Sequence, residues 1–203
     1  MAYDAEVLVV GCGNVLFKDD GFGPAVIMEI EKNLENRPLP DNVMTIDAGT
    51  GAPHFLFSLP NPMWKKLIII DIGNFDGQPG DVVKLTKDQV PTGKYQDPHS
   101  ISVADPLEDL DDVEVVIIAC QPEKVSSPFV EYGLTETLEK AIPKAIDMVY
   151  EEVKIWINRL NSSISSSTLS FFYKVVMLQP SFSIIIVCSV CETHPLLLSL
   201  IIA

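Results

Sequence analysis

The sequence contains few basic residues. Lysine and arginine account for 14 of its 203 residues, against 28 aspartates and glutamates, which leaves a formal net charge of −14. A surface of this sign repels the phosphates of nucleic acids and the headgroups of anionic lipids. We therefore expect no nucleic-acid partner. The charge suits a metal cation or a basic protein segment as partner, or serves only to keep the chain in solution.

Signals for secretion are also missing. The stretch from Met1 to Glu6 has no basic residue, and the apolar run behind it ends at Gly11 after a few residues. A signal peptide needs a basic start and a longer apolar core. The four cysteines form no dense framework of the kind that crosslinks small secreted domains. The sequence therefore predicts a cytoplasmic protein with reduced thiols.

The first glycine-rich loop lacks both common nucleotide-binding fingerprints. Gly11-Cys12-Gly13 follows an apolar run and precedes a helical pattern, as in a G-x-G-x-x-G dinucleotide motif, but Leu16 occupies the position of the third glycine. The loop also lacks the Gly-Lys-Ser/Thr ending of a P-loop. We therefore expect no dinucleotide and no resident organic cofactor.

Short apolar runs rich in β-branched residues recur along the chain. A shorter run over 82–85 predicts an edge or antiparallel strand. Runs over 7–10 and 113–119 predict buried strands, and runs over 43–46 and 67–70 predict two further strands. Amphipathic patterns between and after these runs predict helices over 24–34, about 52–59 and 134–157. We predict an α/β fold: a single three-layer domain whose central, mostly parallel, twisted sheet of about five strands has helices on both faces.

The last predicted helix contains Pro143. Proline has no backbone N–H and collides with the preceding turn, so the sequence predicts a kink or a break there.

The composition changes abruptly after Leu160. Residues 161–203 carry only two charged side chains and are rich in serine. We predict one α/β domain over residues 1–160 and a serine-rich, apolar extension over 161–203. The uncharged run Val175 to Cys191 is shorter than the about 20 residues of a membrane helix. The composition leaves open a membrane anchor and a non-native extension, and it favours the second.

Polar side chains follow the predicted strands, and parallel sheets bind ligands beyond the carboxyl ends of their strands. Asp19 and Asp20 lie in the loop after the first strand, Asp71 ends the third strand, and His99 lies in the long connection before the last strand. Two carboxylates and one imidazole form an open oxygen and nitrogen set that suits a borderline divalent ion such as nickel or zinc. The sequence therefore predicts a metal-contacting site.

Each of these residues also has a simpler interpretation. Asp19 or Asp20 could cap the helix that follows, Asp71 could be a turn residue, and His99 could be an ordinary loop histidine. Cys12 could act as a nucleophile, but it has no histidine or base near it in sequence. Its place at a strand end equally suits a buried core thiol.

Several motifs resemble those of the hydrogenase maturation endopeptidase family. They span most of residues 5–160 in the family's order and spacing, and they are Gly11-Cys12-Gly13-Asn14-Val15-Leu16-Phe17-Lys18-Asp19-Asp20-Gly21-Phe22-Gly23, Asp47-Ala48-Gly49-Thr50, Ile70-Asp71, Pro98-His99 and Ala104-Asp105. Among the branches of the family, the chain looks most like the one that serves archaeal deazaflavin-reducing hydrogenases.

The resemblance implies an aspartyl-type endopeptidase that removes the C-terminal extension of a nickel–iron hydrogenase large-subunit precursor after nickel insertion. On this interpretation nickel belongs to the substrate, Asp20, Asp71 and His99 contact it, and Asp47 borders the cleft and takes part in cleavage. Asp20 stands where the family often has glutamate, and Ala48 where glycine is common. The alternative is a non-catalytic nickel-binding chaperone for the immature large subunit.

Overall fold

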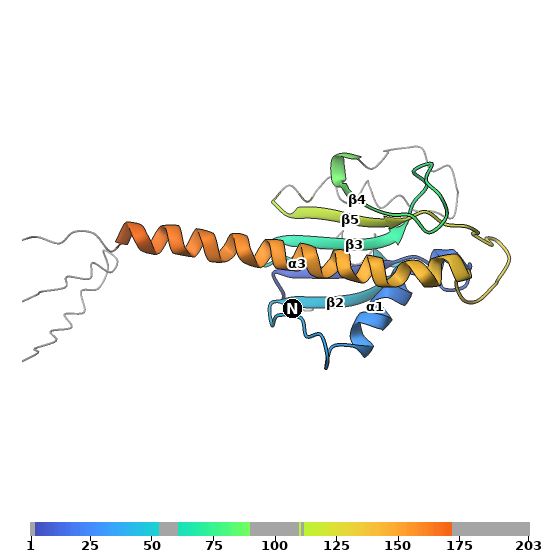
Figure 1. Cartoon of the computed structure of the whole chain (residues 1–203), viewed down its shortest axis with the longest axis horizontal. Helices are drawn as coiled ribbons and strands as arrows, with labels where there is room; N and C mark the ends of the chain where they lie inside the picture. Colours follow the sequence, from blue (N-terminus) through green and yellow to red (C-terminus); the bar gives the residue numbers. More distant parts are fainter. Residues whose placement is uncertain (1–2, 53–60, 90–109, 111, 172–203) are drawn as a thin grey trace, which may run out of the picture. The chain divides into compact units, whose positions relative to one another are not determined.

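The computed structural model describes residues 3–52, 61–89, 110 and 112–171, the last nine of these by their backbone alone. Contacts divide the chain into two units, Met1–Val153 and Lys154–Ala203. The fold described below is that of the first unit (Figure 1).

A five-stranded sheet forms the centre of the first unit. Its strands are β1 (Val7–Cys12), β2 (Val43–Gly49), β3 (Lys66–Ile72), β4 (Val82–Thr86) and β5 (Glu114–Cys120). They lie in the order β2-β1-β3-β5-β4. All neighbouring pairs are parallel except β4 and β5, which run antiparallel at one edge. The predicted mostly parallel sheet with an antiparallel edge strand is confirmed.

The central strands are buried on both faces of the sheet. In β1, the side chains of Leu8, Val10 and Cys12 join a buried cluster that includes Trp64 and Leu110. Those of Val7 and Val9 alternate with them and are also fully buried, as expected for strands covered on two sides.

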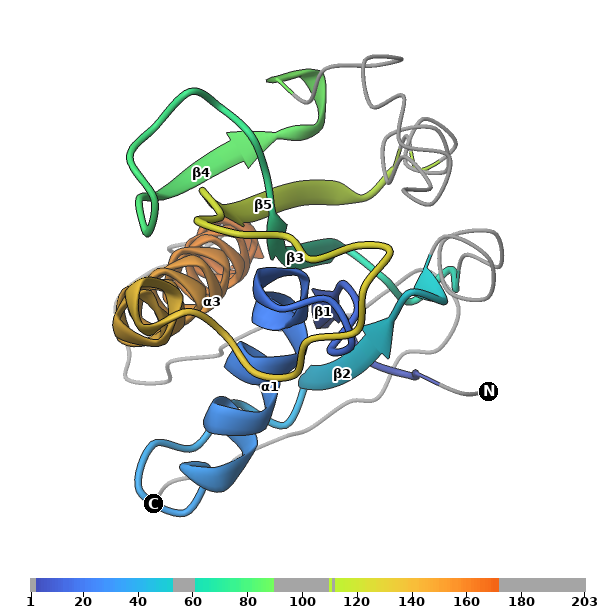
Figure 2. The same ribbon diagram turned by 90° about the vertical axis from the view of Figure 1, so that its right-hand side faces the viewer.

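Two helices lie on the same side of this sheet: α1 (Phe22–Lys32) and the part of α3 (Glu136–Phe171) that belongs to the first unit (Figure 2). Their buried residues recur at helical spacing, which gives each helix one apolar stripe; they are Val26, Ile27 and Ile30 in α1 and Leu138, Ala141, Ala145 and Val149 in α3. The predicted α/β class is confirmed, whereas helices on both faces of the sheet stay a prediction. The helix predicted over 52–59 lies outside the described residues except for its first one.

Helix α3 continues through Pro143 and ends at Phe171. Of the two predicted alternatives the break is therefore wrong, and the kink stays a prediction. Pro143 cannot donate to the carbonyl of Glu139, one turn earlier. Both residues are exposed, and water can take the place of the missing donor. Within the described residues, no helix has the length and apolar character needed to cross a membrane.

Helix α1 approaches the strands closely because two glycines face each other. A Cβ atom on Gly23 would lie 2.2 Å from the carbonyl oxygen of Cys12 and 2.4 Å from that of Ile70, and one on Gly11 would lie 2.6 Å from the carbonyl oxygen of Gly23. Any larger side chain would push the helix away from the sheet. This close contact fixes the start of α1, and with it the preceding loop, at the carboxyl ends of β1 and β3.

A buried ion network lies at the other end of β3. The fully buried Lys66 Nζ donates to Glu152 Oε2 at 2.7 Å and to Glu114 Oε1 at 3.0 Å, and Lys84 Nζ donates to Glu152 Oε1 at 2.6 Å. Burial opposes ionisation of Glu152, but the hydrogen bonds and positive charges of Lys66 and Lys84 outweigh it and lower the pKa of this carboxyl. The network joins β3, β4 and β5 to α3.

Candidate functional site

The loop after β1 brings Asp20 to the carboxyl end of β3. Asp20 lies in the 3-10 turn η1 (Asp19–Gly21), and Asn14 N donates to its carbonyl oxygen at 2.9 Å. A Cβ atom on Gly13 would lie 1.9 Å from this carbonyl oxygen and 3.6 Å from Asp71 Oδ1. Gly13 also has φ +122°, which favours glycine. A glycine at this position therefore lets the backbone of Asp20 and the carboxylate of Asp71 approach the same point.

The two carboxyl groups interact. Burial raises the pKa of Asp71 to about 7, and the negative charge of Asp20 adds to this rise, whereas a hydrogen bond of 2.7 Å from Ile72 N to Asp71 Oδ1 opposes it. Asp71 is partly buried. A partly buried acid beside a second acid resists ionisation, and a cation placed between them reverses that effect. The two carboxyl groups are therefore suited to bind a positively charged group.

Asp47 lies near the same edge. The register pairs Gly11 with Asp47 on one side and with Ile70 on the other, so Asp47 and Asp71 lie on strands that flank β1. Asp47 is exposed, and its Oδ1 accepts a hydrogen bond of 3.1 Å from Gly49 N. Its side chain therefore lies at the solvent-exposed side of the site.

Cys12 lies between these acids. Its side chain is 3% exposed, and burial, followed by the charges of Asp71 and Asp47, raises the pKa of its thiol well above the usual range. The thiolate is the nucleophilic form, so these surroundings favour the interpretation of Cys12 as a core thiol.

Of the three predicted metal contacts, the structure brings Asp20 and Asp71 together, and His99 lies outside the described residues. Within residues 3–52, 61–89, 110 and 112–171, no three histidine, cysteine, aspartate or glutamate side chains form a group that could hold a metal ion. A complete metal-contacting set therefore stays a prediction that depends on His99.

Asp19 has a role that the sequence did not reveal. It does not cap α1, whose N-cap residue Gly21 makes no side-chain capping bond. Instead its fully buried carboxylate accepts four hydrogen bonds. Oδ2 accepts from Glu123 N (3.0 Å), Lys124 N (2.8 Å) and Thr135 Oγ1 (3.1 Å), and Oδ1 accepts from Thr135 N (2.7 Å). These partners are more than 100 residues away along the chain, so no local pattern could have identified them.

Replacing Asp20 with asparagine is expected to lower the pKa of Asp71 below its value of about 7, because the substitution removes one of the two causes of the rise. The carboxyl carbon shift of Asp71, followed by NMR against pH, measures this change. Asp76→Asn, a substitution at an exposed position of the loop after β3, is the control. An unchanged midpoint in the Asp20 variant would show that the two carboxyl groups do not interact.

Comparison with known proteins gives consistent matches. The family model described as hydrogenase maturation protease matches residues 24–152. The coenzyme F420 hydrogenase subunit delta of Methanothermobacter thermautotrophicus is 51% identical over 156 residues, which are 76% of this chain and 99% of the relative. The hydrogenase 2 maturation protease of Escherichia coli is 31% identical over 153 residues, 71% of this chain and 88% of the relative.

A solved structure also matches. The hydrogenase maturating endopeptidase HybD of Escherichia coli superposes with a TM-score of 0.58 at 29% identity, covering 73% of this chain and 92% of that one.

Proposed function

The chain belongs to the hydrogenase maturation protease family, and from this premise we propose that it removes the C-terminal extension of a nickel–iron hydrogenase large-subunit precursor after nickel has been inserted. It is an endopeptidase, as its family is. The relative from Methanothermobacter is named as a subunit of the coenzyme F420 hydrogenase. We therefore take the large subunit of a hydrogenase of that type as the substrate.

The observation that carries the proposal is the pair formed by Asp20 and Asp71. Two interacting carboxyl groups at the carboxyl edge of a parallel sheet supply oxygen ligands to an incoming cation. In this proposal the cation is the nickel ion of the precursor, so metal and protein arrive together as substrate. We expect His99 to add a nitrogen ligand, which would complete the set.

The raised pKa of Asp71 gives this site two states. Without a cation, burial and the charge of Asp20 raise the pKa of Asp71 to about 7, which favours its protonated form and keeps a second full negative charge away from Asp20. Contact with nickel favours the carboxylate form, because a metal ligand must be deprotonated. We therefore expect recognition of the loaded precursor to be accompanied by loss of the proton from Asp71.

Nickel held against the site would polarise a nearby peptide carbonyl or position a water molecule. Asp47 lies at the exposed side of the same edge. We place it at the border of the cleft, where its carboxylate can contact the peptide to be cut or the attacking water.

The purified chain is expected to shorten a nickel-loaded precursor and to leave a metal-free precursor uncut, because a metal-free precursor brings no cation for the carboxylates of Asp20 and Asp71 to contact. Intact mass spectrometry of the large subunit measures the shortening.

His99→Ala is expected to reduce the rate of this shortening by about 100-fold or more while leaving the circular dichroism spectrum unchanged, since loss of one group that acts only on the reacting complex has effects of this size.

Two other results would change the interpretation. A stable complex with the loaded precursor and no change in mass would favour the nickel-binding chaperone. Equal shortening of loaded and metal-free precursors would show that nickel is not the recognition mark.

A further inference from the structure

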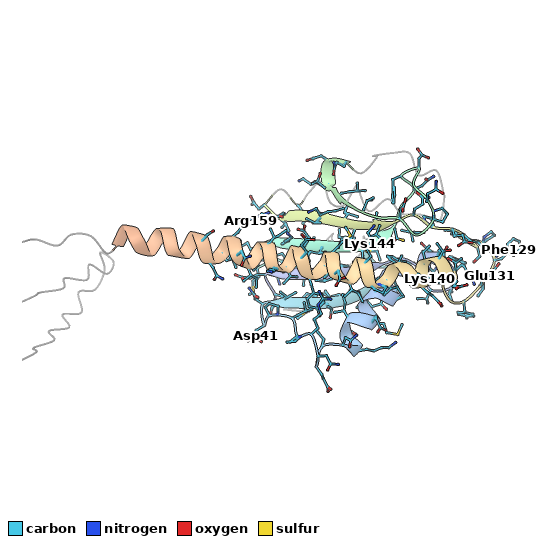
Figure 3. All side chains as sticks on the ribbon, in the orientation of Figure 1. Asp41, Phe129, Glu131, Lys140, Lys144 and Arg159 are labelled. Carbon is cyan, nitrogen blue, oxygen red and sulfur yellow. The ribbon has the colours of Figure 1, made fainter. Side chains whose placement is uncertain are left out.

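The segment that joins β5 to α3 carries apolar side chains at the surface. We call residues 122–133 the docking loop. Val125 is 43% exposed, Phe129 75%, Val130 55% and Tyr132 72%. The loop passes across the carboxyl ends of the strands (Figure 2), and Phe129 extends outward from it (Figure 3). Exposed aromatic side chains that gather on one loop are typical of contact surfaces for other proteins.

Hydrogen bonds hold the docking loop against the loop that carries Asp20. Lys18 N donates to Glu131 O at 2.8 Å, and Glu131 N donates to Leu16 O at 2.9 Å. Asp19 N donates to Lys124 O at 3.2 Å. Lys18 itself has φ 61°, a conformation that residues other than glycine adopt infrequently. The first loop is thus held from both sides by the two arms of the docking loop.

The buried carboxylate of Asp19 fixes the ends of the docking loop. It binds the backbone of Glu123 and Lys124 at one end, and the backbone and hydroxyl of Thr135 just beyond the other. Hydrogen bonds to a buried charge are among the stronger ones in proteins. Because Asp20 is the next residue, the position of the loop is set relative to the proposed metal contact.

The contact that this surface offers is mainly apolar. Lys124, a lysine of the docking loop, is paired with Glu131 at 2.7 Å, so it does not present an unpaired positive charge. The net charge of −14 also disfavours an anionic lipid surface. A protein with an apolar segment fits both observations.

We propose that Val125, Phe129, Val130 and Tyr132 form the surface on which an apolar segment of the large-subunit precursor docks, at a distance from Asp20 that Asp19 sets. The inference rests on the proposed function, because a precursor that is cleaved at the site of Asp20 and Asp71 must lie against the carboxyl ends of the strands, where the docking loop also lies. The docking loop is hydrogen-bonded to the loop that carries Asp20, so its exposed aromatic side chains lie next to the proposed site. Docking there supplies affinity, whereas nickel recognition at Asp20 and Asp71 supplies the condition for cleavage.

The test measures kcat and KM for nickel-loaded precursor with the full chain. The double variant Phe129→Ser/Tyr132→Ser is expected to raise KM by about tenfold or more, because exposed aromatics that become buried in an interface dominate its affinity. Its kcat is expected to stay within about threefold of wild type, because neither residue reaches the reacting atoms. Met28→Ser, a change at a 51% exposed apolar residue on α1, is the matched control.

The possible outcomes separate this inference from the proposed function. If wild type shortens the precursor and the double variant has the same KM, the docking surface is wrong and the proposed function stands. If wild type neither binds nor shortens the precursor, the proposed function fails and the inference fails with it. Two further results would assign the surface to another occupant. They are a dimer of the chain in sedimentation, or binding to neutral lipid vesicles, provided that the double variant abolishes it without a change in KM. Unfolding of the double variant would move the test to Tyr132→Ser alone.

Discussion

Asp71→Asn is expected to abolish processing of the precursor and also to stabilise the fold at pH 8. Asparagine keeps the shape of the side chain but removes the carboxylate that we assign to nickel, so we expect the processing rate to fall by about 100-fold or more. The same change removes a charge that the folded state disfavours, since burial and Asp20 raise the pKa of Asp71 to about 7. Loss of activity with gain of stability distinguishes a functional residue from a structural one.

The sign of the pH dependence follows from proton binding. The pKa of Asp71 rises from 3.8 to about 7 on folding, so the folded state binds more protons between these values. The stability from this shift is fully present below about pH 4 and is lost as the pH rises through about 7. The full shift corresponds to at most about 4 kcal/mol, and partial exposure of Asp71 reduces it. We expect Asp71→Asn to raise the free energy of unfolding by about 2 kcal/mol at pH 8 and by little at pH 4.

Urea denaturation of wild type and Asp71→Asn at both pH values measures these differences, with Asp76→Asn as the control at an exposed aspartate. A variant that is less stable than wild type at pH 8 would mean that the carboxylate of Asp71 supports the fold.

Glu152→Ala is expected to lower the free energy of unfolding by about 3–5 kcal/mol, because it leaves the fully buried ammonium of Lys66 without its closest partner. Lys66 Nζ and Glu152 Oε2 are 2.7 Å apart, and only 5% of the Glu152 side chain is exposed. Thermal and urea denaturation measure the loss. Glu151→Ala, a change at the neighbouring exposed position, should alter the free energy of unfolding by no more than about 0.5 kcal/mol.

A second variant tests whether charge or packing causes the loss. Replacing both Lys66 and Glu152 with methionine removes the buried charges together and keeps apolar volume. We expect this double variant to recover most of the stability lost in Glu152→Ala, as found for other buried pairs exchanged for apolar residues. A double variant as unstable as the single one would assign the effect to the shape of the side chains.

The sheet could be predicted from the sequence because its pattern is local. The β-branched runs that became β1, β3 and β5 are buried along nearly their whole length, and such runs differ clearly from the helical spacing of Val26, Ile27 and Ile30. Pro143 shows the limit of local rules, since an exposed carbonyl tolerates the loss of its donor and α3 continues.

The site was predictable only in part. Asp20, Asp47 and Asp71 could be placed at one edge, because parallel strands end together. The function of Asp19 depends on hydrogen bonds to residues 123, 124 and 135, and the pKa of Asp71 depends on burial in the folded chain. Both are consequences of tertiary structure, so neither is visible in the order of residues.

The carboxylate of Asp19 has a thermodynamic consequence. It is bonded to the ends of the docking loop and is adjacent to Asp20. On the proposed docking, an adjustment of that loop would therefore be transmitted to the metal contact. Linkage then acts equally in both directions: whatever factor docking adds to the affinity for nickel, nickel adds to the affinity for the docked segment. A precursor without nickel would therefore bind more weakly for two reasons: it lacks the contacts of the metal with Asp20 and Asp71, and it lacks the gain in docking affinity that the metal provides.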